Sequence, residues 1–368
     1  MRTGPYTFED LLAFMPEGWQ AKAKELGAFE RAREVHSPGD LLRLLFLYLT
    51  EGKSFAGTSA LVRLGGDMEL NKTAVYKRIR NSGEWLKWLC ENLFRGAGLL
   101  VEKPGWLEGR DVCLVDGSED VTRGEGKSYY MLHYCLDVFT LGMREFHITD
   151  IRTGEKVGNF EGLGGNDIVV GDRAYGTLPG IQYLRGRGSG YVLRLRGKAF
   201  TVYDGEGNEV KMTEMFRGLG TGEYGSRGVY CRIDGEVVPL RICALRKDGD
   251  SERAGLKRLK KTNQRKCGGK AVSKEQEEYN RYIMVATSLG EEVEASSVLE
   301  LYRARWQIEL AFKRLKSLFE YNQIPGKVGE SVYAWFYGKL LLAGLCERLV
   351  NTGRFSPREG RGGMWGRI

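Results

Sequence analysis

The sequence predicts an α/β protein in which a mixed sheet follows a helical N-terminal region. The apolar run Leu41–Leu49 follows Ser37-Pro38, a typical helix start, and similar helical patterns extend over residues 1–104. Beyond residue 105 the chain changes to short runs of apolar and β-branched residues separated by glycines. Several strands, followed by a strand, a helix and another strand, predict a mixed sheet.

The helical region contains two short helices around the turn Gly65-Gly66-Asp67. Thr58–Leu64 would form the first helix and Lys72–Arg80 the second. This pair resembles a helix-turn-helix, which predicts a DNA-binding region. An ordinary helical bundle with a basic surface explains the pattern equally well. The basic side chains that would meet DNA are Lys77, Arg78 and Arg80.

Residues 105–197 would form the first part of the sheet. The turn Phe139–Gly142 would join two of its strands as a hairpin, and Gly180–Arg187 would form a helix. The strand candidates are Asp111–Val115, Met131–Val138, Met143–Ile151, Asp167–Val170 and Gly190–Leu195.

Residues 198–291 predict a β-rich insertion, because short alternating runs are separated by glycines. Its basic stretch Lys257–Lys266 indicates either a nucleic-acid-binding arm or a solvated loop. Residues 292–350 return to helical patterns and would complete the domain begun at residue 105, whereas the tail 351–368, rich in Gly and Arg, predicts disorder. The strand candidates of the insertion are Val229–Ile233, Val237–Leu245 and Tyr282–Thr287, and the last helix would span Val332–Leu349.

Composition and charge limit the functional classes. The net charge is +8 and the isoelectric point about 9.0, which gives weak support to a polyanionic partner. Seven scattered cysteines without a CxxC pair, and only three histidines, argue against a disulfide framework and a zinc site. The acidic residues near the N-terminus argue against a signal peptide, and Gly338–Cys346 is too short to span a bilayer. We therefore expect a cytoplasmic protein that does not enter membranes.

Leu301–Lys316 contains no Gly or Pro and predicts one continuous helix. On this helix alone, Arg305–Glu309 and Glu309–Lys313 would be solvent-exposed ion pairs worth ~0.3–0.5 kcal/mol each. The apolar stripe that the spacing predicts to be buried is Leu301, Ile308, Phe312, Leu315 and Phe319. The polar stripe is Tyr302, Arg305, Glu309, Lys313 and Lys316.

Two aspartates change the interpretation of Glu309. Asp116 and Asp172 each follow an apolar strand candidate, where a single Asp is most often a turn former. Two such residues beside one sheet edge, together with Glu309, predict a site for Mg²⁺ or Mn²⁺. Two ions at such a site can activate an attacking water or 3′-hydroxyl and stabilise the leaving oxygen.

Three motifs resemble one family. Tyr302, Arg305, Glu309 and Lys316 fit the pattern Y-x2-R-x3-E-x6-K, with VDGS at 115–118 and VVGDRAYG at 169–176 upstream. These motifs resemble those of the insertion-sequence-4 family of DDE transposases, over about residues 40–345. Further similarities are Leu132-His133, Thr149-Asp150 and Gly154-Glu155.

The resemblance implies a ribonuclease-H-like catalytic core interrupted by the β-rich insertion. Asp116, Asp172 and Glu309 would then be the catalytic ligands of two Mg²⁺ or Mn²⁺ ions. Trp306 would either stack on a base or pack in the core. The DNA-contacting side chains implied around these acids are Tyr302, Arg305, Lys316, Lys313, Arg173 and Tyr175.

The implied function is transposition. The enzyme would bind the terminal inverted repeats of its element, cut DNA there and join the 3′ ends to target DNA, as a homodimer in the DNA complex. One alternative is a metal-dependent nuclease of the same fold that joins no strands. Another is an inactive derivative that binds the repeats without cutting, although such a copy has no chemical reason to keep Asp116, Asp172 and Glu309.

Overall fold

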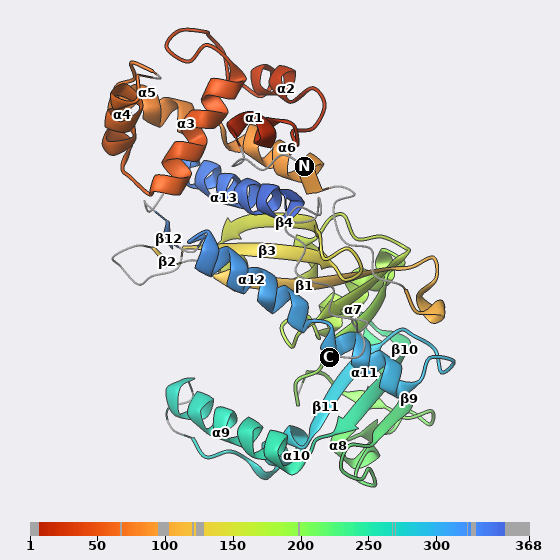
Figure 1. Ribbon diagram of the computed structural model, residues 1–368. Coiled ribbons are helices and arrows are strands. Elements are labelled where there is room, and N and C mark those ends of the chain that lie inside the picture. The colour runs from red at the N-terminus through yellow and green to blue at the C-terminus, as the bar shows by residue number, and fades with distance from the viewer. Residues whose placement is uncertain are drawn as a thin grey trace, which may run out of the picture.

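The chain folds into a group of helices beside a long mixed sheet (Figure 1). The computed structural model describes residues 7–66, 68–94, 103–119, 121–122, 129–197, 199–266, 268, 270–321, 323–324 and 329–349. The predicted tail at 351–368 lies outside the described residues. The predicted mixed α/β architecture is confirmed.

A ten-stranded sheet runs through the lower part of the molecule, in the order β4-β3-β1-β5-β6-β11-β10-β9-β7-β8. Strands from residues 198–291 therefore extend the sheet that begins at residue 111. The first five strands are β1 (Asp111–Glu119), β3 (Tyr130–Asp137), β4 (Met143–Asp150), β5 (Asp167–Gly171) and β6 (Gly190–Arg194). The others are β7 (Val202–Tyr203), β8 (Glu209–Val210), β9 (Tyr224–Ile233), β10 (Glu236–Arg246) and β11 (Tyr282–Thr287). β2 (Val121–Thr122) and β12 (Gln323–Ile324) form a separate parallel pair.

The register of β1 decides where the first aspartate lies. β1 runs parallel to β5 as far as the pair Val115–Gly171, so Asp116 and Asp172 come next on adjacent strands. On its other side β1 stays paired with β3 up to Glu119. The prediction that Asp116 follows its strand is therefore wrong, because antiparallel pairing with β3 continues the strand past it. Asp172 does follow its strand, as predicted.

The N-terminal residues form helices, as predicted. Ser37 caps its helix by accepting a hydrogen bond from the Asp40 N–H at 3.1 Å, and Asn71 caps another in the same way from the Ala74 N–H at 2.9 Å. These elements are α1 (Phe8–Leu12), α2 (Trp19–Glu25), α3 (Pro38–Glu51), α4 (Phe55–Leu64), α5 (Lys72–Arg80) and α6 (Gly83–Phe94).

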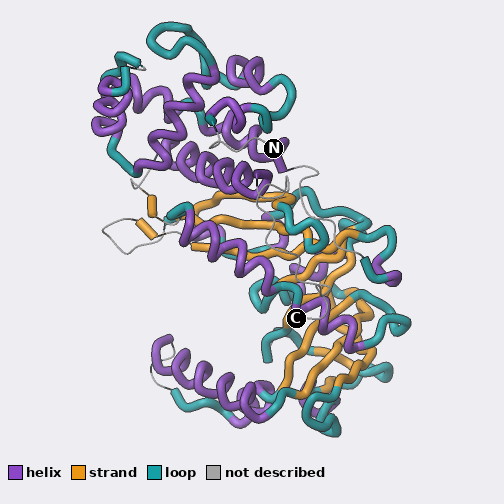
Figure 2. The backbone as a smooth tube through the Cα atoms, in the orientation of Figure 1, coloured by secondary structure: helices purple, strands orange, loops and turns teal. Residues whose placement is uncertain are grey.

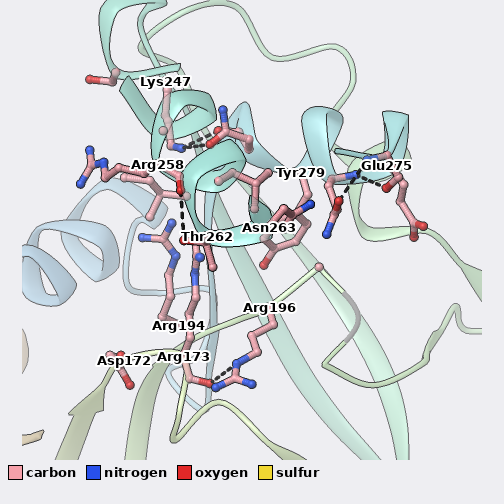
Figure 3. Close-up of a pocket in the computed structure, with 18 of the residues that line it drawn as sticks. Asp172, Arg173, Arg194, Arg196, Lys247, Arg258, Thr262, Asn263, Glu275 and Tyr279 are labelled. Carbon is pink, nitrogen blue, oxygen red and sulfur yellow. Dashed lines mark hydrogen bonds between the residues drawn. The ribbon is translucent and has the colours of Figure 1, made fainter. Parts of the chain in front are cut away.

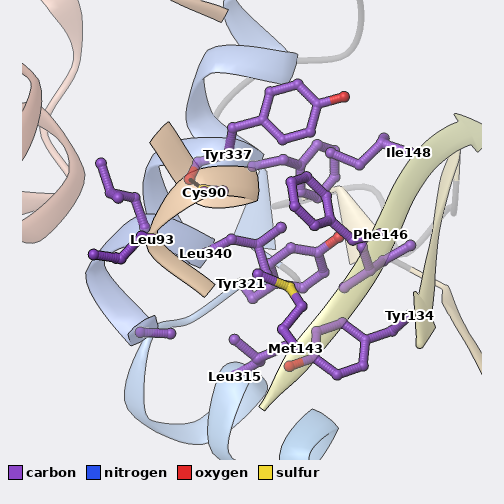
Figure 4. Packing of buried hydrophobic residues seen from close by; sticks show 14 of the residues in the cluster. Cys90, Leu93, Tyr134, Met143, Phe146, Ile148, Leu315, Tyr321, Tyr337 and Leu340 are labelled. Atoms are coloured by element: carbon purple, nitrogen blue, oxygen red, sulfur yellow. Dashed lines mark hydrogen bonds between the residues drawn. The ribbon is translucent and has the colours of Figure 1, made fainter. Parts of the chain in front are cut away.

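The helix α13 (Glu330–Leu349) lies between the N-terminal helices and the sheet (Figure 1). It is apolar around most of its circumference, and its side chains are buried against both neighbours. Figure 4 shows Cys90 and Leu93 of α6 close to Tyr337 and Leu340 of α13, with Phe146 and Tyr134 of the sheet to their right. One core therefore joins the N-terminal helices to the sheet.

The predicted helix Leu301–Lys316 is two helices, α11 (Ala295–Arg303) and α12 (Trp306–Leu318). The prediction of one continuous helix is wrong. At the break the Arg305 N–H bonds to the Tyr302 carbonyl at 3.1 Å and the Gln307 N–H to the Ala304 carbonyl at 2.9 Å. These bonds span three residues rather than four, so the chain tightens into a turn between the two helices. The apolar stripe is confirmed, with Leu301, Ile308, Phe312 and Leu315 buried and Phe319 partly buried.

The basic stretch Lys257–Lys266 belongs to the helix α9 (Gly249–Lys266), so the solvated-loop alternative is wrong. Asp248 accepts the Ser251 N–H at 2.8 Å before the first turn, and acidic residues in that turn precede the basic end, which suits the helix dipole. α9 and α10 (Lys274–Asn280) project from the end of the sheet (Figure 2). The remaining helices are α7 (Leu178–Gly186), α8 (Met212–Met215) and the 3₁₀ helices η1 (Gly105–Leu107), η2 (Ile151–Thr153) and η3 (Val157–Asn159).

Among the helices in the described ranges, none combines the length and apolar character needed to cross a membrane.

Candidate active site

Asp116 and Asp172 lie at one edge of the sheet, each bound to a nearby backbone amide. The Asp116 Oδ1 accepts the Gly117 N–H at 2.9 Å. The Asp172 Oδ1 accepts the Ala174 N–H at 2.7 Å, which shapes the turn that leaves β5. Each carboxylate keeps a second oxygen for another partner.

Arg305 connects this edge to α12. Its Nη1 lies 3.4 Å from the Asp116 Oδ2, and its Nη2 donates a hydrogen bond to the Glu309 Oε1. The predicted pair Arg305–Glu309 is confirmed. Arg305 stands at the break between α11 and α12, and its guanidinium reaches Asp116 of β1. One cation thus joins an aspartate and a glutamate 193 residues apart in the chain (309 − 116).

The charges of the neighbouring carboxylates shift the pKa of Asp116. Burial raises the pKa of Asp116 to about 6, the Gly117 N–H and Arg305 oppose the rise, and the charges of Asp172 and Glu309 add to it. The three acids that the sequence predicts to act together are therefore close enough to interact through their charges. A divalent cation placed among them would relieve this repulsion.

Glu155 is a fourth acid at this edge, and the sequence reasoning gave it no role. Burial raises its pKa to about 7, and the charges of Asp172, Asp116 and Glu119 add to the rise. A Cβ atom at Gly117 would lie 2.7 Å from the Glu155 Oε1, so a side chain at this position would displace the Glu155 carboxylate from its place beside Asp116. The Gly154-Glu155 pair noted among the family similarities was the signal that could have found it.

The donor chemistry of this edge fits a hard divalent cation, since carboxylate oxygens are the ligands that Mg²⁺ and Mn²⁺ prefer. Within the described ranges, no three acidic, histidine or cysteine side chains are grouped tightly enough to hold a metal ion. Arg305 supplies the positive charge between Asp116 and Glu309 in this arrangement.

The predicted DNA-contacting residues of α12 lie along one exposed face. Lys313 and Lys316 line a cavity of about 600 Å³ together with Gly117 and Glu309. Trp306 is 53% exposed, so the alternative that it packs in the core is wrong. The Tyr302 ring lies 5.6 Å from the Arg194 guanidinium, on the side of Asp172.

The two residues predicted from the second motif have different positions. Arg173 lines a cavity beside Asp172, where burial and the charge of Arg194 lower its pKa. Tyr175 is only 1% exposed and packs near Phe160, with its ring centroid 6.4 Å away. Its side chain belongs to the core beneath the site rather than to a surface open to DNA.

The basic residues of α5 are partly engaged within the protein. Arg78 donates to the Arg31 carbonyl at 3.0 Å, and Arg80 pairs with Glu330 of α13 at 3.4 Å. Burial lowers the pKa of Arg78. Lys77 is exposed. Of the three cations predicted to bind DNA here, Arg78 and Arg80 make contacts within the protein, to Arg31 and to Glu330.

Comparison with known proteins places this chain in a family. The family described as "Transposase DDE domain" matches residues 108–345, a range that includes Asp116, Asp172 and Glu309. The chain is 31% identical over 352 residues to "Putative transposase InsL for insertion sequence element IS186A" from Escherichia coli (strain K12), with 94% of each chain covered. It is also 31% identical over 353 residues to "Transposase for insertion sequence element IS421" from Escherichia coli, again with 94% of each covered. A shorter match, 27% identical over 207 residues, links it to "Transposase for insertion sequence element IS231F" from Bacillus thuringiensis subsp. israelensis, covering 49% of this chain and 41% of that one. The chain therefore belongs to the transposase DDE domain family.

Proposed function

We propose that this protein is the transposase of an insertion sequence. It binds the terminal inverted repeats of its element, cuts DNA there and joins the 3′ ends to target DNA. What supports this most is the contact of Arg305 with both Asp116 and Glu309, because it brings two motif acids together beside the strand that Asp172 follows. The names of the relatives with 94% coverage agree with this function.

The catalytic core would be ribonuclease-H-like and of the insertion-sequence-4 type. Three antiparallel strands, β4, β3 and β1, continue on the other side of β1 into the parallel strands β5 and β6. This order supports such a core, with residues 105–197 and 292–350 as its parts and residues 198–291 as an insertion. The same site residues would serve a nuclease, but the transposase names of the relatives favour the joining enzyme.

Asp116, Asp172 and Glu309 would hold two Mg²⁺ or Mn²⁺ ions. When bound, such ions activate the attacking water or 3′-hydroxyl and stabilise the leaving oxygen. Arg305 balances the charges of Asp116 and Glu309 in the free protein, and its guanidinium can pair with a phosphate of bound DNA instead. The hydrogen bonds that the backbone amides of Gly117 and Ala174 donate hold the side chains of Asp116 and Asp172 in position.

DNA would lie along the exposed face of α12. Lys313 and Lys316 would contact phosphates, with Tyr302 and Arg173 on the opposite side of the acids. Trp306 is exposed enough to stack on a base. The N-terminal helices, with the exposed Lys77, would add contacts to the repeat. Both ends of the element must meet in one complex, so we expect a homodimer on DNA. We expect the protein to act in the cytoplasm, at the nucleoid.

The test is a strand-transfer assay with labelled oligonucleotides that carry the ends of the element. The sequences of these ends are taken from the DNA that flanks the gene. Joined products support the transposase. Nicks alone would indicate a nuclease, and a mobility shift without cleavage would indicate an inactive binding protein.

Substitution of the acids tests the site itself. Asp172→Asn and Glu309→Gln should each abolish Mg²⁺-dependent cleavage while DNA binding survives, because the metal ligand is lost and the phosphate contacts remain. Glu300→Gln, at an exposed position on α11, is the matched control and should cut normally. Retained cleavage in either site variant would refute the assignment of these acids.

A further inference from the structure

A second, larger cavity opens beside Asp172, on the side away from Lys313 and Lys316. Its volume is about 1140 Å³, and its walls come from α9, α10, the end of β6 and the segment around Tyr302. Figure 3 shows Arg258 and Thr262 of α9 on one side, Arg194 and Arg173 on the other, and Asp172 at the edge.

The cavity carries a large excess of positive charge. Among the described residues, seven Arg and Lys side chains line it against two carboxylates, those of Asp172 and Glu275. Two of its cations contact neutral groups, since Arg196 donates to the Arg173 carbonyl at 3.1 Å and Lys247 donates to the Asn280 carbonyl, whereas Arg305 is paired with Asp116 and Glu309. The buried Arg194 Nε has no hydrogen-bond partner within the described part of the chain. Such a group of cations calls for an anion from outside the protein.

The cations also repel one another. Burial lowers the pKa of Lys247 to about 8, and the charges of Arg194, Arg173 and Arg258 lower it further, against a smaller opposing effect of Glu252. Glu252 is itself engaged, since it pairs with Arg246 at 3.4 Å and Arg281 at 3.3 Å. A bound polyanion would remove this repulsion.

The helix α9 packs against α10, and one face of α9 lines the cavity. A Cβ atom at Gly255 would lie 3.2 Å from the Asn280 Cγ and overlap its oxygen, so glycine allows α9 to pack closely on α10. Asn280 also donates to the Glu252 carbonyl at 2.9 Å. The α9 residues that line the cavity are Ser251, Gly255, Arg258, Leu259, Thr262 and Asn263, which recur at helical spacing. Lys257, next to Arg258, is exposed and does not line it.

We infer that this cavity binds successive phosphates of the DNA strand that passes Asp172, with α9 as its outer wall. The inference rests on the proposed function and adds a phosphate-binding site distinct from α12. The cavity exceeds the ~300–1,000 Å³ of ordinary small-molecule pockets, and its cations come from β6, from the loop after β10 and from α9. Cations spread over several walls suit a row of phosphates better than a single small anion.

Arg258 gives the most direct test, because it is exposed on a helix and alanine there keeps the helix intact. Binding of a fluorescent duplex carrying the terminal repeat is measured by anisotropy in EDTA over a series of salt concentrations. Arg258→Ala should weaken binding roughly three- to tenfold and reduce the salt slope by about 0.9, as expected for one lost phosphate contact. Lys257→Ala, the matched control, should leave the slope unchanged. Equal behaviour of the two variants overturns the inference.

A second measurement uses the wild-type protein. Bound duplex should protect Lys247 from an amine-directed reagent at pH 8, because the strand would cover the cavity that it lines. Unchanged labelling of Lys247 in a complex that forms fully would overturn the inference. Wild-type cleavage and joining are measured in parallel. If both occur while Arg258→Ala matches Lys257→Ala, only the cavity assignment fails; if the wild type neither binds nor cuts, the proposed function fails with it.

Discussion

Arg305 is the side chain on which the arrangement of the candidate site depends most. It is 19% exposed and contacts carboxylates from β1 and α12, at the point where two helices meet. Burial alone would lower the pKa of Arg305, but Tyr302, Glu309 and Asp116 together raise it. Its charge therefore stays in place at any pH where the protein folds, and compensates acids that repel one another.

The burial of Asp116, with a smaller effect of repulsion from Asp172 and Glu309, makes stability depend on pH. The pKa of Asp116 is about 6 in the folded protein and 3.8 for an ordinary aspartate, so the folded state holds a proton that the unfolded chain has released between these values. Stability contributed by Asp116 is thus present below about pH 4 and is lost as pH rises to 6. Asp116→Asn should raise the free energy of unfolding at pH 7.5 by on the order of 1–3 kcal/mol and have little effect at pH 4.

Urea denaturation at pH 4, 5 and 7.5 would measure this dependence. Glu300→Gln, at an exposed carboxylate, should change stability little at each pH. A gain for Asp116→Asn that is equally large at pH 4 would show that the ionisation of the buried Asp116 is not its cause.

Lys316 tests the DNA face of α12. Lys316→Ala should weaken binding of the terminal-repeat duplex and reduce the salt slope by about 0.9, because one phosphate contact is lost. Lys211→Ala, at an exposed position near β8, is the comparison. An unchanged slope would place Lys316 on a solvated face that does not touch DNA.

At the scale of elements, the turn that carries Asp172 is shaped by its close approach to the strand β6. Gly176 ends this turn and lies against the backbone of β6. A Cβ atom there would overlap the carbonyl oxygen of Arg194 and lie 2.9 Å from its carbonyl carbon. Backbone cannot move aside as a flexible side chain can, so the motif ends in glycine for a packing reason.

Gly176→Ala should therefore destabilise the protein by on the order of 2–3 kcal/mol and disturb Asp172. Gly186→Ala, at the end of α7, is the control, because a Cβ atom there meets nothing within 4 Å. The control should be neutral or slightly stabilising, since alanine favours helix over glycine. Equal unfolding midpoints in urea for the two variants would contradict this account of Gly176.

At the scale of the whole molecule, α13 makes the N-terminal helices part of the same body as the sheet. The Cys90 thiol donates to the Tyr337 carbonyl at 3.2 Å, and Trp335, Phe336 and Leu341 of α13 are at most 4% exposed. The N-terminal region therefore covers a large apolar surface in addition to any contact with DNA.

Removal of residues 1–104 should expose this surface and cause aggregation. Soluble yield, size-exclusion chromatography and thermal unfolding of the 105–368 fragment would measure the effect, with the full chain as control. A soluble monomeric fragment with a cooperative transition would show that the two parts fold independently.

Local sequence signals determined most of the elements and the identity of the three acids. The Ser37-Pro38 start, the β-branched runs and the motif spacing from Tyr302 to Lys316 can be recognised from short stretches, because capping, strand preference and side-chain order act within a few residues. The mixed α/β class and the family follow from the same signals.

Only the tertiary structure decided how those parts meet. The break before α12, the place of Asp116 inside β1, the burial of Tyr175 and the position of Glu155 beside Gly117 all depend on partners far away in the chain. The same holds for the cavity under α9, where cations from three segments converge. Contacts of this kind are set by the register of a sheet and by the packing of helices on it, and no short stretch of sequence carries that information.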